Sequence, residues 1–322
     1  MFSILFALLL LAIGTILLLF GADWFIDGAS DLARLLSISA LVVGILLAGL
    51  EPEEMLTAAI ASARGAPGLA VGNVIGTNIT IVTFALGLSA LITPIALRPT
   101  VRRQAIIATL ASIVPIVLLA SGLVTRLEGI LLLLIFAVYT FVLFRLDRES
   151  LTNLAKLEDD DDDELESATR SRPKSFPWKA VLQTGGGLLA MTLGGPAIVE
   201  GALRLTQAIG LSAGVIGATI VSLGTGAEMI ALGITAARKQ KAELLVGGII
   251  GSFAYNLLIT LGLAAAIRPV PVETRLLLIA LPIMVAAHLA LLGLIWYGKL
   301  NRAIGAIFVL AYLGYLVFVI FG

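Results

Sequence analysis

The chain has 322 residues and no formal net charge; 59% of its residues are hydrophobic and only 13% are charged. A soluble domain carries about 25% charged residues, so this composition, with a mean hydropathy of +1.08, indicates an integral membrane protein. Cysteine is absent from the sequence, which excludes disulfides and thiolate metal sites. The apolar runs are long enough to cross about 30 Å of hydrocarbon as helices, and alternating barrel segments are missing. The expected fold class is therefore all-α.

The hydrophobic pattern predicts about ten transmembrane helices. The first has neither a basic segment before its apolar run nor a small-residue cleavage site after it, so we expect it to stay in the protein and not to be removed as a signal peptide. In chain order the helices are expected at about residues 3–33, 38–64, 68–96, 101–122, 126–146, 179–207, 211–238, 242–267, 273–296 and 302–321.

One long polar segment, residues 147–178, divides these helices five and five. It contains seven consecutive acidic residues, EDDDDDE at 158–164, which repel one another and cannot fold on their own. We interpret the segment as a solvated cytoplasmic linker; the alternative is a calcium-sensing or regulatory acidic loop. The predicted organisation is a first five-helix half at 1–146 and a second at 179–322.

Basic residues in the loops predict the orientation of the chain. With the linker in the cytoplasm, nine basic residues of the other loops share its side and five lie opposite. The nine are Arg34, Arg98, Arg102, Arg103, Arg238, Lys239, Lys241, Lys299 and Arg302; the five are Arg64, Arg126, Arg204, Arg268 and Arg275. An odd number of helices per half gives the halves inverted topology, which is typical of transporters with a substrate site near the membrane midplane.

The two halves also match in sequence, which indicates an internal repeat. Glu54-Met55 lines up with Glu228-Met229, and VGNVIGT at 71–77 lines up with VGGIIGS at 246–252; the stretches end in ALRPT and AIRPV. The first repeat covers about residues 38–96 and the second about 211–267. The G-x-x-x-G spacing inside each match predicts close helix packing. The glycines concerned are Gly72 and Gly76, matched by Gly247 and Gly251.

Each repeat carries glutamate inside apolar sequence. A carboxylate near the bilayer centre costs at least ~2.5 kcal/mol, so such a residue indicates a functional site. The first repeat reads Gly49-Leu50-Glu51-Pro52-Glu53-Glu54 and the second reads Gly224-Thr225-Gly226-Ala227-Glu228. A purely structural role, such as helix capping or an interhelical hydrogen bond, is the alternative for Glu54 and Glu228.

A glutamate-bearing helix followed by a GNxIGSN-like stretch, present twice and inverted, resembles the α-repeats of the cation/calcium exchanger superfamily. The resemblance covers nearly the whole chain, including the ten-helix count and the acidic central loop. It implies a secondary-active antiporter that exchanges Ca²⁺ for Na⁺ or H⁺ by alternating access, and no enzyme. Carried over by position, the acids are Glu54 and Glu228, the hydroxyls of the next helices are Thr77 and Ser252, and Asn256 stands at a later acid or amide position.

The chain departs from the family pattern G-T-S-L-P-E in both repeats. The first repeat has Leu50 and Glu51 in place of the hydroxyl pair, and Ile81 where an amide is expected opposite Asn256. The second repeat is one residue shorter, closer to the G-N-A-x-E form of proton/calcium members. A one-residue gap would pair Glu53 with Glu228, but the aligned Glu-Met and downstream arginine favour Glu54. The oxygen-poor first repeat weakens the case for several sodium sites.

Calcium takes six to eight oxygen ligands, and the glycines and proline of the two motifs can free backbone carbonyls where they line a cavity. Thr77 and Ser252 have small-residue packing as their alternative, and for Glu51 and Glu53 we favour vestibule or outer positions. Without the cation, the opposed glutamates must be neutralised by protons or Na⁺, which gives antiport. The predicted ligand set is Glu54, Glu228, Thr77, Ser252, Thr225, Asn256, Glu53, Glu51, Gly49 and Gly224.

Several alternatives stay open. The transported ion could be Mg²⁺ or Mn²⁺, which also prefer oxygen ligands, and a cation channel is a further option, although channels favour rings of identical subunits.

His288 is expected to pack in the core. Asp23, Asp27 and Glu200 are expected to snorkel or to pair with Arg34 or Arg204, or to line a cation entry path. The expected partners are inorganic cations and the lipid bilayer of a prokaryotic cytoplasmic membrane, with no cofactor and no nucleic acid; the oligomeric state is left open.

Overall fold

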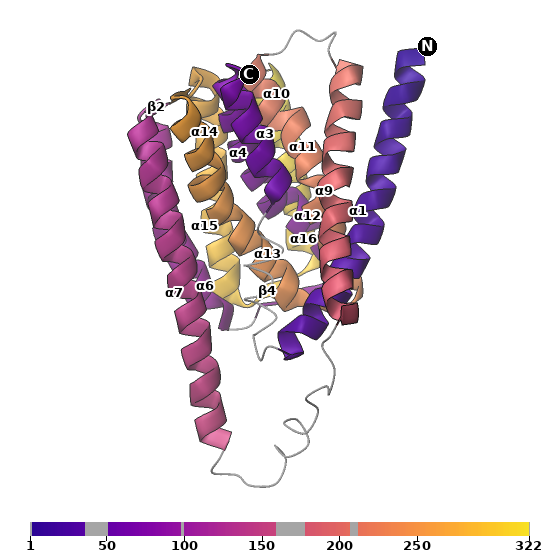
Figure 1. Cartoon of the computed structure of the whole chain (residues 1–322), viewed down its shortest axis with the longest axis vertical. Helices are drawn as coiled ribbons and strands as arrows, with labels where there is room; N and C mark the ends of the chain where they lie inside the picture. The colour runs from indigo at the N-terminus through magenta and orange to yellow at the C-terminus, as the bar shows by residue number, and fades with distance from the viewer. Residues whose placement is uncertain (1, 36–50, 98–99, 159–177, 207–211, 322) are drawn as a thin grey trace.

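The structure is a computed structural model that describes residues 2–35, 51–97, 100–158, 178–206 and 212–321. Apart from four two-residue strands, its regular elements are helices (Figure 1). Eight of the described helical segments are long and apolar enough to cross a membrane. The all-α membrane fold class is therefore confirmed. Gly49 and the acidic residues 159–164 lie outside the described residues.

The first half begins with a single long helix, α1 (Phe2–Leu35). The described part of the first repeat begins with the short helix α3 (Pro52–Ala63). A longer helix follows in three consecutive segments, α4 (Pro67–Ile79), the π-helical η2 (Thr80–Ala85) and α5 (Leu86–Ile92). The half ends with β1 (Ile95–Ala96), α6 (Thr100–Ala120), β2 (Leu123–Val124) and α7 (Arg126–Glu158).

The second half follows the same order, starting with α9 (Trp178–Thr206). The second repeat contains α10 (Ala213–Ile216), the π-helical η3 (Gly217–Val221), α11 (Ser222–Thr225), α12 (Ala227–Arg238), α13 (Ala242–Tyr255), the π-helical η4 (Asn256–Thr260) and α14 (Leu261–Ile267). After it come β3 (Val270–Pro271), the π-helical η5 (Leu276–Ala280), α15 (Leu281–Tyr297), β4 (Lys299–Leu300) and α16 (Arg302–Phe321).

The predicted linker boundary at residue 147 is wrong, because α7 continues as far as Glu158. The prediction followed hydrophobicity, which ends near residue 146. A helix can continue beyond the membrane wherever backbone propensity allows, and residues 147–158 contain no glycine or proline and are rich in Leu, Arg, Glu and Lys, all good helix formers.

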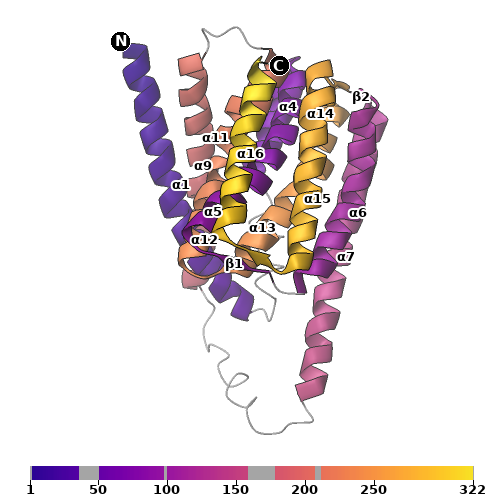
Figure 2. The same ribbon diagram turned by 180° about the vertical axis from the view of Figure 1, so that it is seen from behind.

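The short strands show how the two halves are related. β1 pairs with β4, and β2 pairs with β3, both antiparallel. β1 and β3 are equivalent segments of the two halves, because each begins three residues after the last helix of its repeat, α5 ending at Ile92 and α14 ending at Ile267. The two ribbons nevertheless lie at opposite ends of the bundle, β1–β4 at one end and β2–β3 at the other (Figures 1 and 2). Equivalent segments at opposite ends are what inverted topology requires.

The first helices of the two halves, α1 and α9, lie side by side along one flank of the bundle (Figures 1 and 2). Their backbones approach closely at small residues: a Cβ atom on Gly21 would lie 2.8 Å from the Gly187 carbonyl oxygen, and one on Gly28 would lie 2.5 Å from the Thr184 nitrogen. Close approach at small residues is how helices associate in a membrane. The pair therefore forms a distinct packing unit beside the core.

The repeats cross in the core at a second glycine contact. A Cβ atom on Gly76 would lie 2.5 Å from the Ala218 carbonyl oxygen, and one on Gly217 would lie 2.4 Å from the Leu69 carbonyl oxygen. The packing role predicted for Gly72 and Gly76 is confirmed, since Gly72 meets the Gly214 backbone in the same way. The span Leu244–Ile267 is 94% buried, whereas Arg126–Leu143 is 22% buried. The repeats thus form the protected centre of the protein.

Candidate cation site

Glu54 lies in the first turn of α3. Pro52 is the first residue of the helix, a position that suits proline because its fixed φ is helical and its missing N–H would have no partner there. The Glu54 side chain is 0% exposed. It lies in the first helical turn, where the positive end of the helix dipole stabilises a carboxylate.

Two side chains of α4 hold the Glu54 carboxylate. Asn73 Nδ2 donates a hydrogen bond to Glu54 Oε2, and Thr77 Oγ1 donates to Glu54 Oε1 at 2.8 Å. Asn73 and Thr77 are four residues apart and therefore share one face of the helix. Charge-assisted hydrogen bonds of this kind are stronger than neutral ones, so both carboxylate oxygens have fixed positions.

This network reaches the second repeat through Thr225. The Thr77 and Thr225 hydroxyl oxygens are 3.3 Å apart, and Thr225 Oγ1 lies 3.4 Å from Asn73 Oδ1, while its shortest hydrogen bond, at 3.0 Å, is to the Val221 carbonyl of its own helix. Thr225 is the last residue of α11, just before Gly226 separates α11 from α12. The start of α3 in the first repeat and the interruption between α11 and α12 in the second therefore meet around Glu54, Thr77 and Thr225.

Glu51 enters a second polar cluster. It is 2% exposed, and Asn256 Nδ2 donates to its Oε2 at 2.9 Å. Asn256 also lies 3.3 Å from Ser252 Oγ, and Thr260 Oγ1 donates to Asn256 Oδ1 at 3.3 Å. The structure thus places Glu51 in the buried interior and not in an open vestibule. Asn256 opens the π-helix η4, and π-turns occur frequently at functional sites.

The helices α3 and α12 each have 12 residues and begin at Pro52 and Ala227, so Glu228 matches Glu53 by helix position, and Glu54 matches Met229. The pairing of Glu54 with Glu228 that the sequence favoured is therefore off by one residue. Glu228 lies in the first turn of α12 and is 4% exposed. Gly224, in α11, is buried. Glu53 belongs to the first turn of α3, and its side chain is not among those described. Among the described residues, no three His, Asp or Glu side chains are grouped as a metal centre, so any cation here must also use hydroxyl, amide or backbone oxygens.

The prediction from sequence missed two side chains of these networks, Asn73 and Thr260. Asn73 stands inside the matched VGNVIGT stretch, and its spacing of four residues from Thr77 could have identified it. Ile81 is a buried apolar residue of η2, so the amide of the first repeat acts from position 73. His288 packs as expected: its Nε2 lies 2.8 Å from Thr109 Oγ1, and its ring stacks on Phe253.

A separate polar cluster joins α1 to Lys239, the residue that follows α12. Lys239 Nζ lies 3.2 Å from Asp23 Oδ1 and 3.0 Å from Asp27 Oδ1. Burial lowers the pKa of Lys239, but the hydrogen bonds that its ammonium donates to Asp27 and Asp23, together with the charges of these two carboxylates, outweigh this effect and raise the pKa above its ordinary value. The predicted Glu200–Arg204 pair forms at 2.6 Å, whereas Lys239 is the described partner of the two aspartates.

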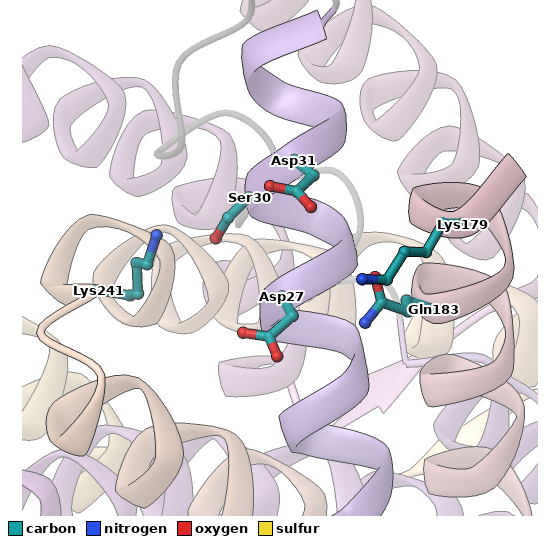
Figure 3. Close-up of a pocket in the computed structure, with 6 residues that line it drawn as sticks. All are labelled: Asp27, Ser30, Asp31, Lys179, Gln183 and Lys241. Atoms are coloured by element: carbon teal, nitrogen blue, oxygen red, sulfur yellow. The ribbon is translucent and has the colours of Figure 1, made fainter. Parts of the chain in front are cut away.

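A pocket of about 180 Å³ lies beside this cluster (Figure 3). Figure 3 shows the α1 side chains in the middle, with Lys179 and Gln183 of α9 on one side and Lys241 on the other. Two acidic and two basic side chains line the pocket, so their charges compensate one another. Its lining residues are Asp27, Ser30, Asp31, Lys179, Gln183 and Lys241.

The inverted halves, the broken helices and the buried carboxylates at the repeat interface define the class of the protein as a membrane transporter of ions. The family model described as "Sodium/calcium exchanger protein" matches residues 6–145 and 179–321. The chain belongs to this family, as its repeats predicted. The family is one of exchangers and not of enzymes.

The chain is similar over nearly its full length to several known proteins. CaxA of Alkalimonas amylolytica is 32% identical over 317 residues, which is 96% of this chain and 97% of CaxA. The sodium/calcium exchanger MaX1 of Methanosarcina acetivorans is 26% identical over 340 residues, 96% of this chain and 97% of MaX1. Among solved structures, the sodium-calcium exchanger NCX_Mj soaked with Na⁺ and Sr²⁺ matches with a TM-score of 0.77 and 25% identity, over 96% of this chain and 97% of that one.

Proposed function

We propose that this protein is a secondary-active antiporter that exchanges Ca²⁺ for Na⁺ or H⁺ by alternating access, across the cytoplasmic membrane of a prokaryote. Its cation site is built from Glu54 and Glu228 with the oxygens around them. The observation that carries the proposal is the fully buried Glu54 carboxylate, which Thr77 connects to Thr225 of the other repeat.

The chemistry of these groups suits a hard cation. Calcium accepts carboxylate, hydroxyl, amide and backbone oxygens in a flexible shell at about 2.3–2.6 Å. The described side chains offer the first three kinds, and the helix breaks beside Pro52 and Gly226 offer the fourth. A soft transition metal is disfavoured, because no cysteine is present and His288 packs elsewhere.

Exchange follows from the charge of the empty site. Two buried glutamates without a cation carry negative charge in a medium where desolvation is costly. Protons or Na⁺ would have to neutralise that charge before the occluded site could cross to the other side. Ca²⁺ and the counter-ion then compete for the same carboxylates, which couples their movements in opposite directions.

The test is the flux of radiolabelled Ca²⁺ into proteoliposomes with an imposed Na⁺ or proton gradient. Uptake that needs an opposing gradient of one of these ions supports antiport and identifies the counter-ion. Competition by Mg²⁺ or Mn²⁺ measures the choice of divalent ion. Downhill current without a gradient of a counter-ion would support a channel, and robust exchange by the Glu54→Gln/Glu228→Gln double variant would end the proposed mechanism.

A further inference from the structure

We infer that Glu51, and not Asn256, is the cation ligand where the first repeat faces α13 and η4, and that Asn256 is a positioning residue that aims this carboxylate. The inference rests on the proposed function, because it assigns roles within the same site. It also reverses the roles expected from sequence, in which Asn256 was a ligand and Glu51 an outer residue.

The hydrogen bonds around Asn256 fix which way its amide faces. An ionised carboxylate only accepts hydrogen bonds, so the amide atom 2.9 Å from Glu51 Oε2 must be the donor, Nδ2. The opposite atom, Oδ1, accepts a hydrogen bond from Thr260 Oγ1. Reversing the amide would place its oxygen against the Glu51 carboxylate, where two acceptor oxygens would repel each other.

This orientation removes Asn256 from the set of cation ligands. Its N–H group faces the shared interior, and an N–H hydrogen repels a cation. Its only side-chain oxygen faces Thr260, within its own helix. Glu51 presents a full negative charge in the same place, and a neutral amide orients that charge without cancelling it. Ser252 Oγ, 3.3 Å from Asn256 Nδ2, supplies a neighbouring neutral oxygen.

The start of α3 explains how one helix serves both clusters. Glu51 is its N-cap residue and Glu54 lies in its first turn. Glu54 bonds to α4 of its own repeat, whereas Glu51 bonds to η4 of the other repeat. The helix dipole stabilises both carboxylates. A cation held by Glu51 would therefore connect the two repeats directly.

The test compares Glu51→Gln, Asn256→Asp and the exchange variant Glu51→Gln/Asn256→Asp in proteoliposomes. We expect Glu51→Gln to raise the KM for Ca²⁺ about 10–100-fold, the range found for polar groups that tune metal sites. Asn256→Asp places two carboxylates against each other and should also impair transport. The exchange variant restores one carboxylate facing one amide, so its KM should return to within about 10-fold of wild type.

Two further variants separate positioning from simple structural damage. Asn256→Ala keeps the Glu51 charge but removes the hydrogen bond that orients its carboxylate. We therefore expect a raised KM for Ca²⁺ with a smaller change in maximal rate. Asn78 is the matched control: it is also buried, but its amide faces the Phe253 carbonyl and the Met284 sulfur. Glu51→Gln should therefore not rescue Asn78→Asp.

The inference is overturned if Glu51→Gln has the wild-type KM for Ca²⁺, or if the exchange variant is no better than Asn256→Asp alone. Thermal stabilisation of each purified variant by Ca²⁺ gives a second measure of affinity that does not need transport. If Asn256→Asp does not fold, Glu51→Gln and Glu51→Asp still decide: the shorter acid must bind Ca²⁺ better than the amide. Unimpaired transport by the Glu54→Gln/Glu228→Gln double variant would instead reject the proposed function itself.

Discussion

The two repeats share one backbone plan but fill it with different side chains. The first repeat has two carboxylates at one helix start, Glu51 as the N-cap residue of α3 and Glu54 in its first turn. On the next helix, α4, Asn73 and Thr77 bond to Glu54. The second has Glu228 at the matching start of α12, followed by the hydroxyl of Ser252 and the amide of Asn256. Inversion of the backbone therefore does not require symmetry of the ligands.

The bonds between the repeats show why this difference is tolerated. Thr77 links Glu54 to Thr225, and Asn256 holds Glu51. In both clusters a carboxylate of the first repeat is connected to a neutral group of the second. Charge lost on one side of the interface can be supplied from the other, because the site belongs to the interface and not to either repeat.

The largest expected effect tests whether the two buried glutamates of the proposed site, one from each repeat, are equivalent. Glu54→Gln and Glu228→Gln should each lower Ca²⁺ exchange at least ~100-fold, since even outer-shell changes cost about 10–100-fold in metal affinity. Initial rates of labelled Ca²⁺ uptake measure this. Glu128→Gln is the control, because Glu128 is an exposed acid that Thr125 bonds at the start of α7. Retained exchange in one variant would show that the two carboxylates are unequal.

Removing single threonine hydroxyls gives a more specific comparison, with a smaller expected effect on transport. Thr77→Val keeps the shape of the side chain but removes the bond to Glu54 and the contact with Thr225. We expect about a 10-fold rise in the KM for Ca²⁺, at the lower end of the range for groups that orient metal ligands. Thr83→Val is the control, since Thr83 bonds only the Ile79 carbonyl of its own helix. Equal effects at both positions would contradict a role specific to the site.

The close crossing of the repeats can be tested through stability. Gly217→Ala would force a Cβ atom to 2.4 Å from the Leu69 carbonyl oxygen, and overpacking of this kind costs about 1–3 kcal/mol. Thermal unfolding in detergent should show a lowered midpoint. Gly314→Ala, with open space around its Cβ position, should show no loss. An unchanged midpoint for Gly217→Ala would mean that the repeats can separate freely here.

The smallest effect is expected outside the repeats, at Lys239. Its ion pairs are partly exposed, so Lys239→Met should lower stability by about 0–1 kcal/mol, and Lys239→Arg should lower it less. Because the pKa of Lys239 is raised, its contribution is fully present below its ordinary value of 10.5 and is lost only as the pH rises through the higher folded value. From neutral pH up to that ordinary value, the unfolding midpoints of wild type and Lys239→Met should differ by a constant amount.

Local properties of the sequence were sufficient to predict the membrane class, the positions of the described spans, the repeat and the acids at its centre. Hydrophobic length and the cost of a buried carboxylate are properties of short segments. The same reasoning misplaced the end of α7, because helix propensity extends beyond the hydrophobic run. It also favoured a vestibule or outer position for Glu51, because a motif gives no measure of burial; the structure shows that this side chain is buried.

Only the tertiary structure decided which groups meet. Glu51 and Asn256 are 205 residues apart in the chain, and Lys239 is 212 residues from Asp27. Such pairs depend on how close two backbones can approach, which is set here by glycines on both sides of each crossing. The sequence by itself determined that a charge must be buried; the packing of the two repeats determined which neutral side chains hold it there.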